Sequence, residues 1–386
     1  MKKTILFILT FLCISLHGQD YLGLNQSNYA GALGIDYNPA NIADNRMEFD
    51  MSINGNLSFY NNYAYMNTKS MPDGWIASFT DTTNDLNVNW RNDPDFGIFI
   101  AADSAEYYQS QYRGNFFVTN PADLGNKSFR GIINENIDLL NIMTAINGKV
   151  SIGVQIKHRT IMNVDHISQE LVTLAVKELD YSTLWNNPLT DQLLNVSLNS
   201  WMEYNINYAQ VVKDDGEHFF KAGGKLKLLR GMGSFYLFSD DVEYDFMNDS
   251  TINKATGDFS YGYSQNAGQV IEPVNGVTPK IFSSSLGLGI DIGAVYEWRP
   301  DWEENKYDMD GETNLWRKDK NKYKLRASFA INDIGSMKYT KAEECRDFTA
   351  NLINFDLEPF GSVQGLTSFD SVITSLVADP TVDINY

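Results

Sequence analysis

The sequence predicts an all-β fold, an antiparallel β-barrel whose strands cross a membrane. Between residues 285 and 299, apolar side chains occupy the even positions from Leu286 to Trp298, and small or charged residues dominate the odd positions. A period of two that holds for about thirteen residues indicates a strand with one apolar and one polar face. Strands of soluble domains usually run about 5–6 residues, whereas a strand that crosses a bilayer needs about 9–11. The length of this segment and its aromatic end are therefore typical of a membrane strand.

The composition argues against several other classes of protein. The 386 residues carry a formal net charge of -19, whereas nucleic-acid binders need a basic face, so we expect no nucleic-acid partner. No segment of the exported chain approaches the roughly twenty apolar residues of a membrane-spanning helix, which excludes a helical membrane protein. Aromatic residues make up 13% of the chain. They would supply the aromatic girdles of a membrane barrel, or fill an ordinary β-rich core.

The N-terminus predicts export. Residues 1–19 combine Lys2 and Lys3, an apolar run at residues 5–16 that is too short to span a membrane, and a small polar end. This order indicates a signal peptide that is cleaved. We expect the remaining residues, 20–386, to form a single domain. After cleavage Cys345 is the only cysteine, so an internal disulfide is excluded.

About nine segments of the exported chain alternate as strands do, with no linker between them. They are residues 48–60, 111–119, 149–158, 199–212, 220–228, 234–246, 258–263, 285–299 and 321–331. A tight turn at residues 213–217 predicts a hairpin between two of them. Residues 164–185 change to a helical spacing, which predicts small helices in that loop. Residues 355–378 predict a loop or a short helix.

The segment before the first strand, residues 20–46, is rich in Gly and Asn. Pro39 disfavours a helix at Asn38, so we expect a compact, irregular segment there.

Four motifs stand out in this order along the chain: Asn38-Pro39-Ala40, the run from Trp201 to Ala209 with the hairpin strand that follows it, the spacing Gly287-x-Gly289-x-Asp291-x-Gly293-x-x-Tyr296, and the stretch from Asn332 to Tyr339. Together they resemble a Bacteroidota family of outer-membrane β-barrels of unassigned function, related to FadL-like and PorV-like barrels. The resemblance covers most of residues 20–340. It implies a barrel of about fourteen strands in the outer membrane of a Gram-negative bacterium, in contact with its lipid. It also implies that residues 20–46, with Asn38, Pro39 and Ala40, fold inward as a plug.

The chain departs from that family at its C-terminus. A full barrel ends with a complete amphipathic strand, but Pro380 limits the last strand to about six residues. The predicted strands are also fewer than the resemblance implies. Either some weak strands do not show a clear alternation, or the chain is a fragment that lacks the C-terminal strands of the barrel, and we favour the fragment. A true fragment would not insert stably alone, because an open sheet edge is not tolerated in lipid.

No arrangement of residues predicts an enzyme. Three of the four histidines lie beyond the signal peptide, and none has the spacing of a metal site. A nucleophile elbow and a phosphate-binding glycine loop are both missing from the sequence. An acidic stretch at residues 308–312 hints at calcium, but Lys306 and Arg317 occupy the positions where a calcium loop needs carboxylates. We expect no catalytic residues, no metal and no cofactor.

Two sets of residues on polar strand faces are candidates to face the lumen of the barrel. They are Gly287, Gly289, Asp291 and Gly293 on one strand, and Lys221, Lys225 and Lys227 on another. The glycines would leave room for a plug or a permeant, or simply relieve crowding in a curved strand. The lysines would attract anions into a lumen, or form a solvated face.

Three functions are compatible with these patterns. The first, which we favour, is the passage of small apolar solutes, as the FadL-like resemblance implies. The second is a non-conducting structural barrel or a partner of the secretion machinery, as the PorV-like resemblance implies. The third is a soluble secreted β-protein that binds glycans through its aromatic residues.

Overall fold

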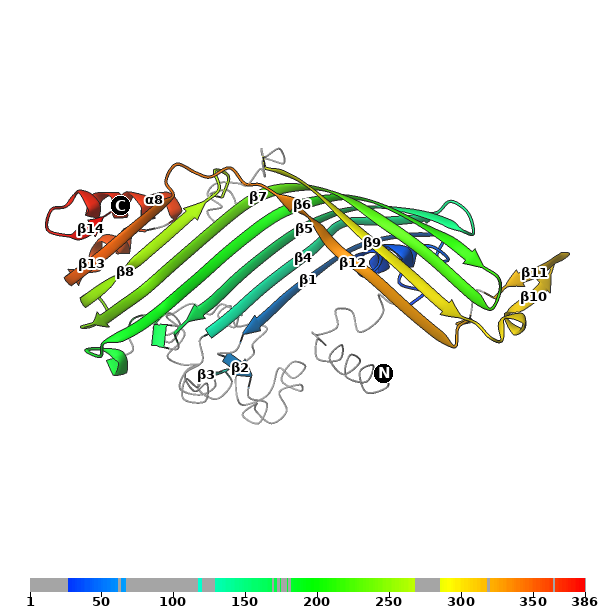
Figure 1. Ribbon diagram of the computed structural model, residues 1–386, viewed down its shortest axis with the longest axis horizontal. Coiled ribbons are helices and arrows are strands. Elements are labelled where there is room, and N and C mark those ends of the chain that lie inside the picture. The colour runs from blue at the N-terminus through cyan, green and yellow to red at the C-terminus, as the bar shows by residue number, and fades with distance from the viewer. Residues whose placement is uncertain are drawn as a thin grey trace, which may run out of the picture.

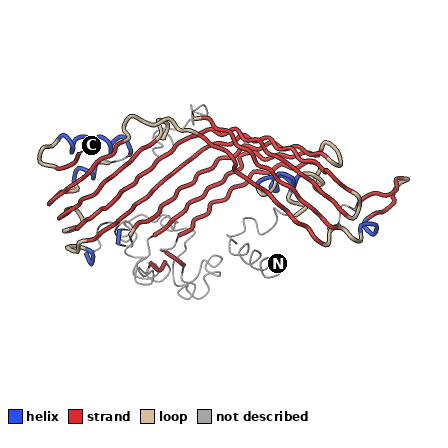
Figure 2. The backbone as a smooth tube through the Cα atoms, viewed as in Figure 1, coloured by secondary structure: helices blue, strands red, loops and turns tan. Residues whose placement is uncertain are grey.

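The computed structural model describes residues 27–61, 64–66, 117–119, 129–168, 170–171, 174, 179, 182–267, 285–317, 320–363 and 365–385. The predicted signal peptide, residues 1–19, lies outside these residues. One antiparallel sheet of ten strands forms the body of the molecule (Figure 1), and strands make up most of the described chain (Figure 2). The all-β prediction is confirmed.

The ten strands follow the order β1-β4-β5-β6-β7-β8-β13-β14, with β9 on β7 and β12 on β9. Their bounds are β1 Phe49–Asn61, β4 Phe129–Ala145, β5 Val150–Ile167, β6 Leu189–Asp214, β7 His218–Phe246, β8 Thr251–Tyr263, β9 Leu286–Trp298, β12 Leu325–Met337, β13 Arg346–Asp356 and β14 Asp383–Asn385. Two small two-stranded sheets are separate from this sheet: β2 (Ala64–Met66) with β3 (Phe117–Thr119), and β10 (Lys306–Met309) with β11 (Glu312–Trp316). Within the described ranges the sheet stays open, because β1 pairs only with β4 and β12 only with β9.

The sheet divides at β7, which is 29 residues long. Residues 218–230 of β7 pair with β9, and residues 235–246 pair with β8. We call β9, β12 and the strand parts beside them the β9 half, and β8, β13, β14 and the strand parts beside them the β8 half. Figure 1 shows that the long strands bend between the two halves, so that the sheet arches.

Several predicted elements differ in extent from the observed ones. The predicted strands at 220–228 and 234–246 are one strand, because a bulge at Met232 lets β7 continue along β6. Strand β4 was not predicted, because a bulge between Asp138 and Leu140 breaks its alternation. Of residues 111–119, only β3 is described. In the predicted helical loop, β5 continues to Ile167, and a short helix η8 (Ser182–Leu184) follows.

The N-terminal segment, residues 27–46, packs on one face of the β9 half as two short 3-10 helices, η3 (Gly31–Asp36) and η4 (Pro39–Ile42). Pro39 stands at the first position of η4, where its missing N–H costs nothing. The apolar side chains of the segment form a small core with the sheet. This core contains Ala32, Ile35, Ile42, Ala43, Met143, Ala209, Val211 and Phe219.

The C-terminal helix α8 (Leu366–Ala378), preceded by η10 (Glu358–Ser362), packs on the β8 half. Tyr261 of β8 meets Phe369 of α8, with ring centroids 5.2 Å apart, and its hydroxyl donates to Asp370 at 2.6 Å. A further short helix, η9 (Trp302–Asn305), precedes the β10–β11 hairpin. Across the described ranges, every helix is too short or too polar to span a membrane.

Helix α8 and the N-terminal segment lie on opposite faces of the sheet. Tyr261 pairs with Leu237, which pairs with Val196 of β6. Directly paired residues point to the same face of a sheet. Tyr261, and with it α8, therefore lies on the face to which Val196 and the other even-numbered residues of β6 point. The N-terminal segment contacts the odd positions instead, because Asn207 donates a hydrogen bond to Pro39.

Candidate functional site

Neighbouring residues of one strand differ sharply in exposure across the β9 half. Ile206 of β6 is 65% exposed, whereas the next residue, Asn207, is 2% exposed. On β7, Leu226 is 64% exposed beside Lys225 at 3%. Successive side chains of a strand point to opposite faces, so the sheet has an apolar outer face and a polar inner face. A soluble sheet with one solvated side has the reverse arrangement.

Lys225 and Lys227 of β7 flank Asp291 of β9 on the inner face. Lys225 Nζ lies 2.9 Å from Asp291 Oδ2, and Lys227 Nζ lies 2.7 Å from Oδ1. The strand register explains the contact, because Lys225 pairs directly with Asp291. All three side chains are buried, and a buried charge persists only when it is paired in this way.

Asp36 of η3 links the N-terminal segment to these charges. Its Oδ1 lies 2.7 Å from Lys157 Nζ and 3.7 Å from Lys225 Nζ, and accepts a hydrogen bond from Gln155 at 2.9 Å. Burial by itself would raise the pKa of Asp36. The two ammonium groups outweigh burial and hold the pKa below its ordinary value of 3.8. Asp36 is therefore ionised at neutral pH and tethers the segment to the sheet.

Asn38 fastens the same segment to the last two strands of the β9 half. Its Nδ2 donates to the backbone oxygens of Ala294 and Phe329, each at 3.1 Å, and to Ser328 Oγ at 2.8 Å. Its Oδ1 accepts a hydrogen bond from the backbone N–H of Ala40 at 2.8 Å. Both ends of this buried amide are therefore satisfied, as a buried polar group requires.

Two paired glycines give the segment its close approach to the sheet. Gly223 of β7 pairs with Gly293 of β9. A Cβ at Gly223 would lie 2.6 Å from the carbonyl carbon of Pro39, and a Cβ at Gly293 would overlap the amide of Asn38. Any side chain at either position would displace the segment.

The segment reaches both edge strands of the β9 half. At β1, Asp50 Oδ2 accepts a hydrogen bond from the backbone N–H of Ala32 at 2.8 Å. At β12, Asn332 Nδ2 donates to the backbone oxygen of Tyr37 at 3.3 Å. Residues 27–46 therefore bridge the two edges of the β9 half across its inner face.

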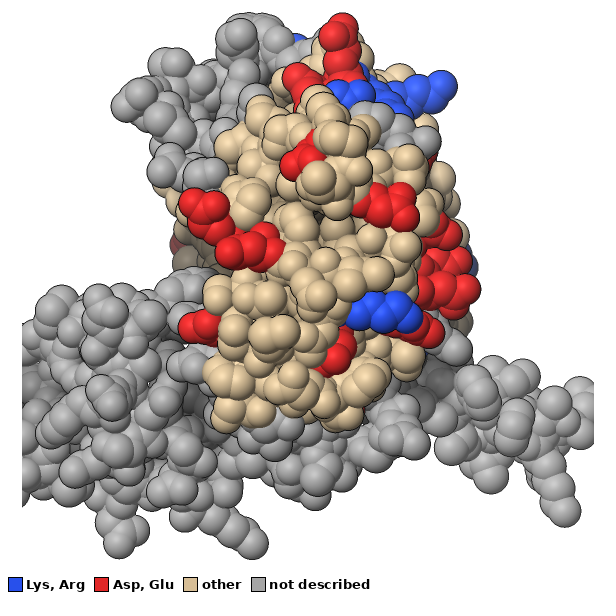
Figure 3. Space-filling model, turned by 90° about the vertical axis from the view of Figure 1, so that its left-hand side faces the viewer, with Lys and Arg blue, Asp and Glu red and all other residues tan. Residues whose placement is uncertain are grey.

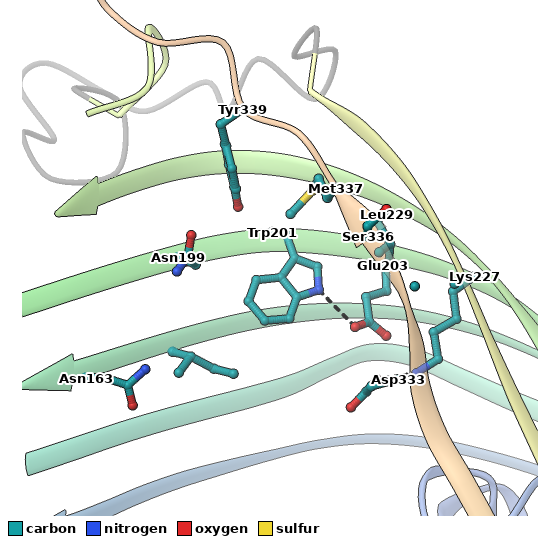
Figure 4. A pocket seen from close by; sticks show the side chains of 13 residues that line it. Asn163, Asn199, Trp201, Glu203, Lys227, Leu229, Asp333, Ser336, Met337 and Tyr339 are labelled. Carbon is teal, nitrogen blue, oxygen red and sulfur yellow. Dashed lines mark hydrogen bonds and ion pairs between the residues drawn. The ribbon is translucent and has the colours of Figure 1, made fainter. Parts of the chain in front are cut away.

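A cavity of about 380 Å³ lies on the inner face next to the bridged region (Figure 4). The side chain of Trp201 stands in the middle of its lining, and its Nε1 donates to Glu203 Oε1 at 2.9 Å. Asp333 contributes a carboxylate from a bulge of β12, where its backbone is in the left-handed region with a φ of 61°. It accepts hydrogen bonds from Lys227 and, at 2.9 Å, from Arg159.

These groups favour binding over catalysis. Each carboxylate of the cavity already pairs with a cation, so it is held as an ion rather than poised to exchange a proton. In the described part of the chain, the structure contains no group of three or more His, Cys, Asp or Glu residues that could hold a metal ion. The inner face can therefore bind a ligand through hydrogen bonds, contact with the aromatic ring of Trp201 and the fit of the ligand to the cavity.

A comparison with protein families identifies the relationship of the chain. Residues 84–382 match the model of a family of unknown function, DUF5723. The chain belongs to DUF5723. No curated protein and no solved structure matches it.

In this DUF5723 member, the residues that the sequence singled out lie on or against the inner face. Asn38, Pro39 and Ala40 are buried in the segment that bridges the edges. Lys221 donates to the backbone oxygen of Ala43 at 2.6 Å. Lys225, Lys227 and Asp291 form the buried cluster, and Gly293 meets Asn38.

Gly287 and Gly289 have different surroundings from Gly293. A Cβ at Gly287 would meet the backbone of Ser336 and Met337 of β12, and a Cβ at Gly289 would make ordinary contact with Lys227. The close approach of the N-terminal segment therefore involves one of the three glycines of β9.

Sequence reasoning missed most charged residues of the inner face, including those that surround the buried cluster and the cavity. Among them are Asp36, Lys157, Arg159, Glu203 and Asp333. Lys157 and Glu203 lie at polar positions of predicted strands, so the alternation of polar and apolar residues could have placed them on the inner face. Asp36 and Asp333 lie in irregular stretches, where no pattern indicates the direction of a side chain.

Proposed function

We propose that the protein is an outer-membrane β-barrel protein whose β9 half lies in the lipid bilayer, with its outer face against acyl chains. The observation that carries this proposal is the inverted exposure along single strands, such as Leu288 at 72% and Asp291 at 1% on β9. Contiguous apolar surface of this kind is costly in water, at about 25 cal/mol per Å². Strand β9 is 13 residues long, and a tilted strand needs about 9–11 to cross the hydrocarbon.

A polar belt on the outer face limits the lipid-facing region. His158 Nε2 lies 3.0 Å from Ser200 Oγ, and Thr160 Oγ1 donates to Ser200 Oγ at 3.2 Å. His158 Nδ1 lies 3.6 Å from a Glu135 carboxylate oxygen. Between this belt and the hairpin turn, β6 runs from Met202 to Val212, about eleven residues, which suits one crossing of the bilayer.

The β8 half then projects into water beyond the belt. Its outer face is covered by α8, whose exposed residues include Ser371, Thr374 and Ser375. A helix that turns hydroxyl groups outward has the polar face that is typical of contact with water. Figure 3 views this end of the molecule and shows Asp and Glu side chains scattered over it. An acidic, helix-covered end favours solvent over lipid.

The inner face supports a sealed barrel rather than an open channel. Residues 27–46 act as the plug, held by Asp36, Asn38 and the paired glycines. The groups that line the inner face are mainly charged or amide groups, whereas the large apolar side chains face outward. This arrangement favours a structural barrel or a secretion partner over a barrel that passes small apolar solutes. The passage of such solutes stays a prediction from the sequence. The outer face disfavours the soluble secreted β-protein.

Heat modifiability tests the membrane proposal. Full-length protein is extracted from outer membranes with detergent and run on an SDS gel with and without boiling. We expect the unboiled protein to migrate differently from the boiled one, because a folded membrane sheet resists SDS. Release of the protein by salt or carbonate alone, with identical migration before and after boiling, would overturn the proposal.

A further inference from the structure

We propose that the cavity around Trp201 binds a neutral saccharide. The cavity has a volume of about 380 Å³ and opens on the inner face at the level of the polar belt, because Trp201 follows Ser200 directly. This volume lies within the range of about 300–1,000 Å³ that is usual for small-molecule sites. The inference goes beyond the membrane proposal and does not depend on it, since the cavity lies on the face turned away from lipid.

The charged groups at the cavity are already paired with opposite charges, which disfavours an ionic ligand. Arg159 Nη1 lies 3.1 Å from Glu203 Oε1 and 2.9 Å from Asp333 Oδ1. Lys227 pairs with Asp333 as well. Lys227 also lies 2.7 Å from Asp291. Each carboxylate of the cavity lining, Glu203 and Asp333, thus already has a cation as its partner. A charged ligand would have to break one of these pairs and leave its partner unpaired in a half-buried site.

The aromatic wall of the cavity is held in a fixed orientation. Trp201 Nε1 donates to Glu203 at 2.9 Å, and the Arg159 guanidinium carbon lies 5.1 Å from the ring centroid. On the other side, the hydroxyl of Tyr339 donates to the backbone oxygen of Ser200 at 2.9 Å. Both rings are therefore positioned before a ligand arrives, which reduces the entropy lost on binding.

The remaining lining suits a molecule with apolar and hydroxylated sides. Ile161, Leu229 and Met337 add apolar surface next to the two rings. The carboxylate of Asp333 is half exposed, and its oxygens can accept further hydrogen bonds. A sugar ring presents C–H groups that pack on an aromatic face and hydroxyls that donate to carboxylates. A neutral sugar satisfies both sides of this cavity without bringing a charge.

Ligand-detected NMR on the purified full-length protein tests the site. The protein is kept in an alkyl amine oxide detergent, because a maltoside detergent would itself carry a sugar. The probes are glucose, N-acetylglucosamine and maltose, with glucuronate and glucosamine as charged counterparts of glucose. We expect saturation transfer from at least one neutral probe, with a dissociation constant on the order of 1 mM, and weaker transfer from both charged probes.

Variants assign the binding to this cavity. Trp201→Ala should remove the transfer, and Asp333→Asn should weaken it severalfold. Trp316→Ala is the matched control, because Trp316 packs on Trp302 in the β10–β11 region, away from the cavity. Each variant must migrate like the wild type on an unboiled gel. If Trp201→Ala does not migrate like the wild type, the milder variant Trp201→Phe replaces it. We expect Trp201→Phe to bind the neutral sugar more weakly than the wild type does.

Three results would overturn the saccharide site. They are the absence of transfer from every neutral probe, transfer that survives in both Trp201→Ala and Asp333→Asn, and tighter binding of a charged sugar than of glucose. A protein that shifts on boiling yet binds none of these sugars would refute the site and leave the membrane proposal intact.

Discussion

At the scale of single residues, Gly293 controls how closely the N-terminal segment approaches the sheet. Its position on β9 faces the Asn38 amide, whereas Gly289 on the same face of the same strand has room beside Lys227. The two glycines therefore form a matched pair of positions. A substitution at Gly293 affects both the strand and the N-terminal segment, whereas the same substitution at Gly289 affects the strand alone.

Gly293→Ala is expected to loosen the segment, and Gly289→Ala is not. The added methyl group at position 293 overlaps Asn38, an overpacking that costs about 1–3 kcal/mol. Limited trypsin digestion checks this, because cleavage after Arg46 should accelerate severalfold in Gly293→Ala. Equal cleavage rates in the two variants would show that residues 27–46 are not seated against β9.

The pH dependence of the segment follows from Asp36. Its pKa in the folded protein lies below the ordinary value of 3.8. A depressed carboxylate pKa contributes stability that is present above 3.8 and is lost as the pH falls further toward the folded-state value. The protection factors of the amides of residues 31–42, which correct for the intrinsic pH dependence of hydrogen exchange, should therefore stay high from neutral pH down to about pH 4 and fall only in stronger acid.

Asp36→Asn is the control for that profile. The variant leaves Lys157 with one carboxylate fewer, so exchange in residues 31–42 should be faster at neutral pH and should lose its acid-dependent step. A variant with the wild-type profile would show that the acid step arises from another carboxylate, such as Asp138, which lies 3.3 Å from Lys157.

Alternation predicted the inner-face residues within strands but not their partners. Asp291 and Lys225 fall at polar positions of clear patterns, and their pairing needs only the strand register. Asp36 meets Gln155 across a separation of 119 residues. The alternation within one strand carries no information about a contact between residues so far apart in the sequence.

At the scale of elements, β6 and β7 are far longer than one membrane crossing. They contain 26 and 29 residues, more than twice the roughly 9–11 that a crossing needs. Their length was hidden in the sequence, because the bulge at Met232 inverts the alternation of β7 and makes one strand read as two. Bulges are invisible to a search for a strict period of two.

Cysteine labelling should distinguish the lipid-facing and water-facing parts of these elements. In a Cys345→Ser background, we compare Leu226→Cys on the outer face of β7 with Ser371→Cys on α8. Both positions are exposed on the protein. In proteoliposomes a water-soluble maleimide should react with position 371 and leave position 226 mostly unlabelled.

Detergent-solubilised, denatured protein provides the reference for this experiment, since both cysteines should then react fully. Rapid labelling of position 226 in intact proteoliposomes would place the outer face of β7 in water and contradict the lipid-facing assignment.

At the scale of the whole molecule, strand patterns predicted the all-β class but not the division of the sheet. Strand β7 could pair along its whole length with one neighbour, yet it takes β9 for one part and β8 for the other. That choice depends on bulges and register rather than on apolar spacing. The barrel of about fourteen strands that the resemblance implies stays a prediction, because the apolar spacing of single segments does not determine how the strands pair.

Removal of residues 27–46 is expected to open the inner face. The wild-type protein should be silent in planar lipid bilayers, because the segment covers the inner face from β1 to β12. The deletion variant should show discrete conductance steps, provided that it still shifts on boiling. A deletion variant that inserts but remains silent would indicate that a further part of the chain seals the molecule.

The contact between Asn38 and Ser328 joins positions 290 residues apart. Asn38 precedes β1 in the chain, but its binding site is complete only when β12 has paired with β9. Closing so long a loop is slow relative to pairing of adjacent hairpins. Docking of the N-terminal segment is therefore expected to be a late step of folding, which follows the pairing of β12 with β9.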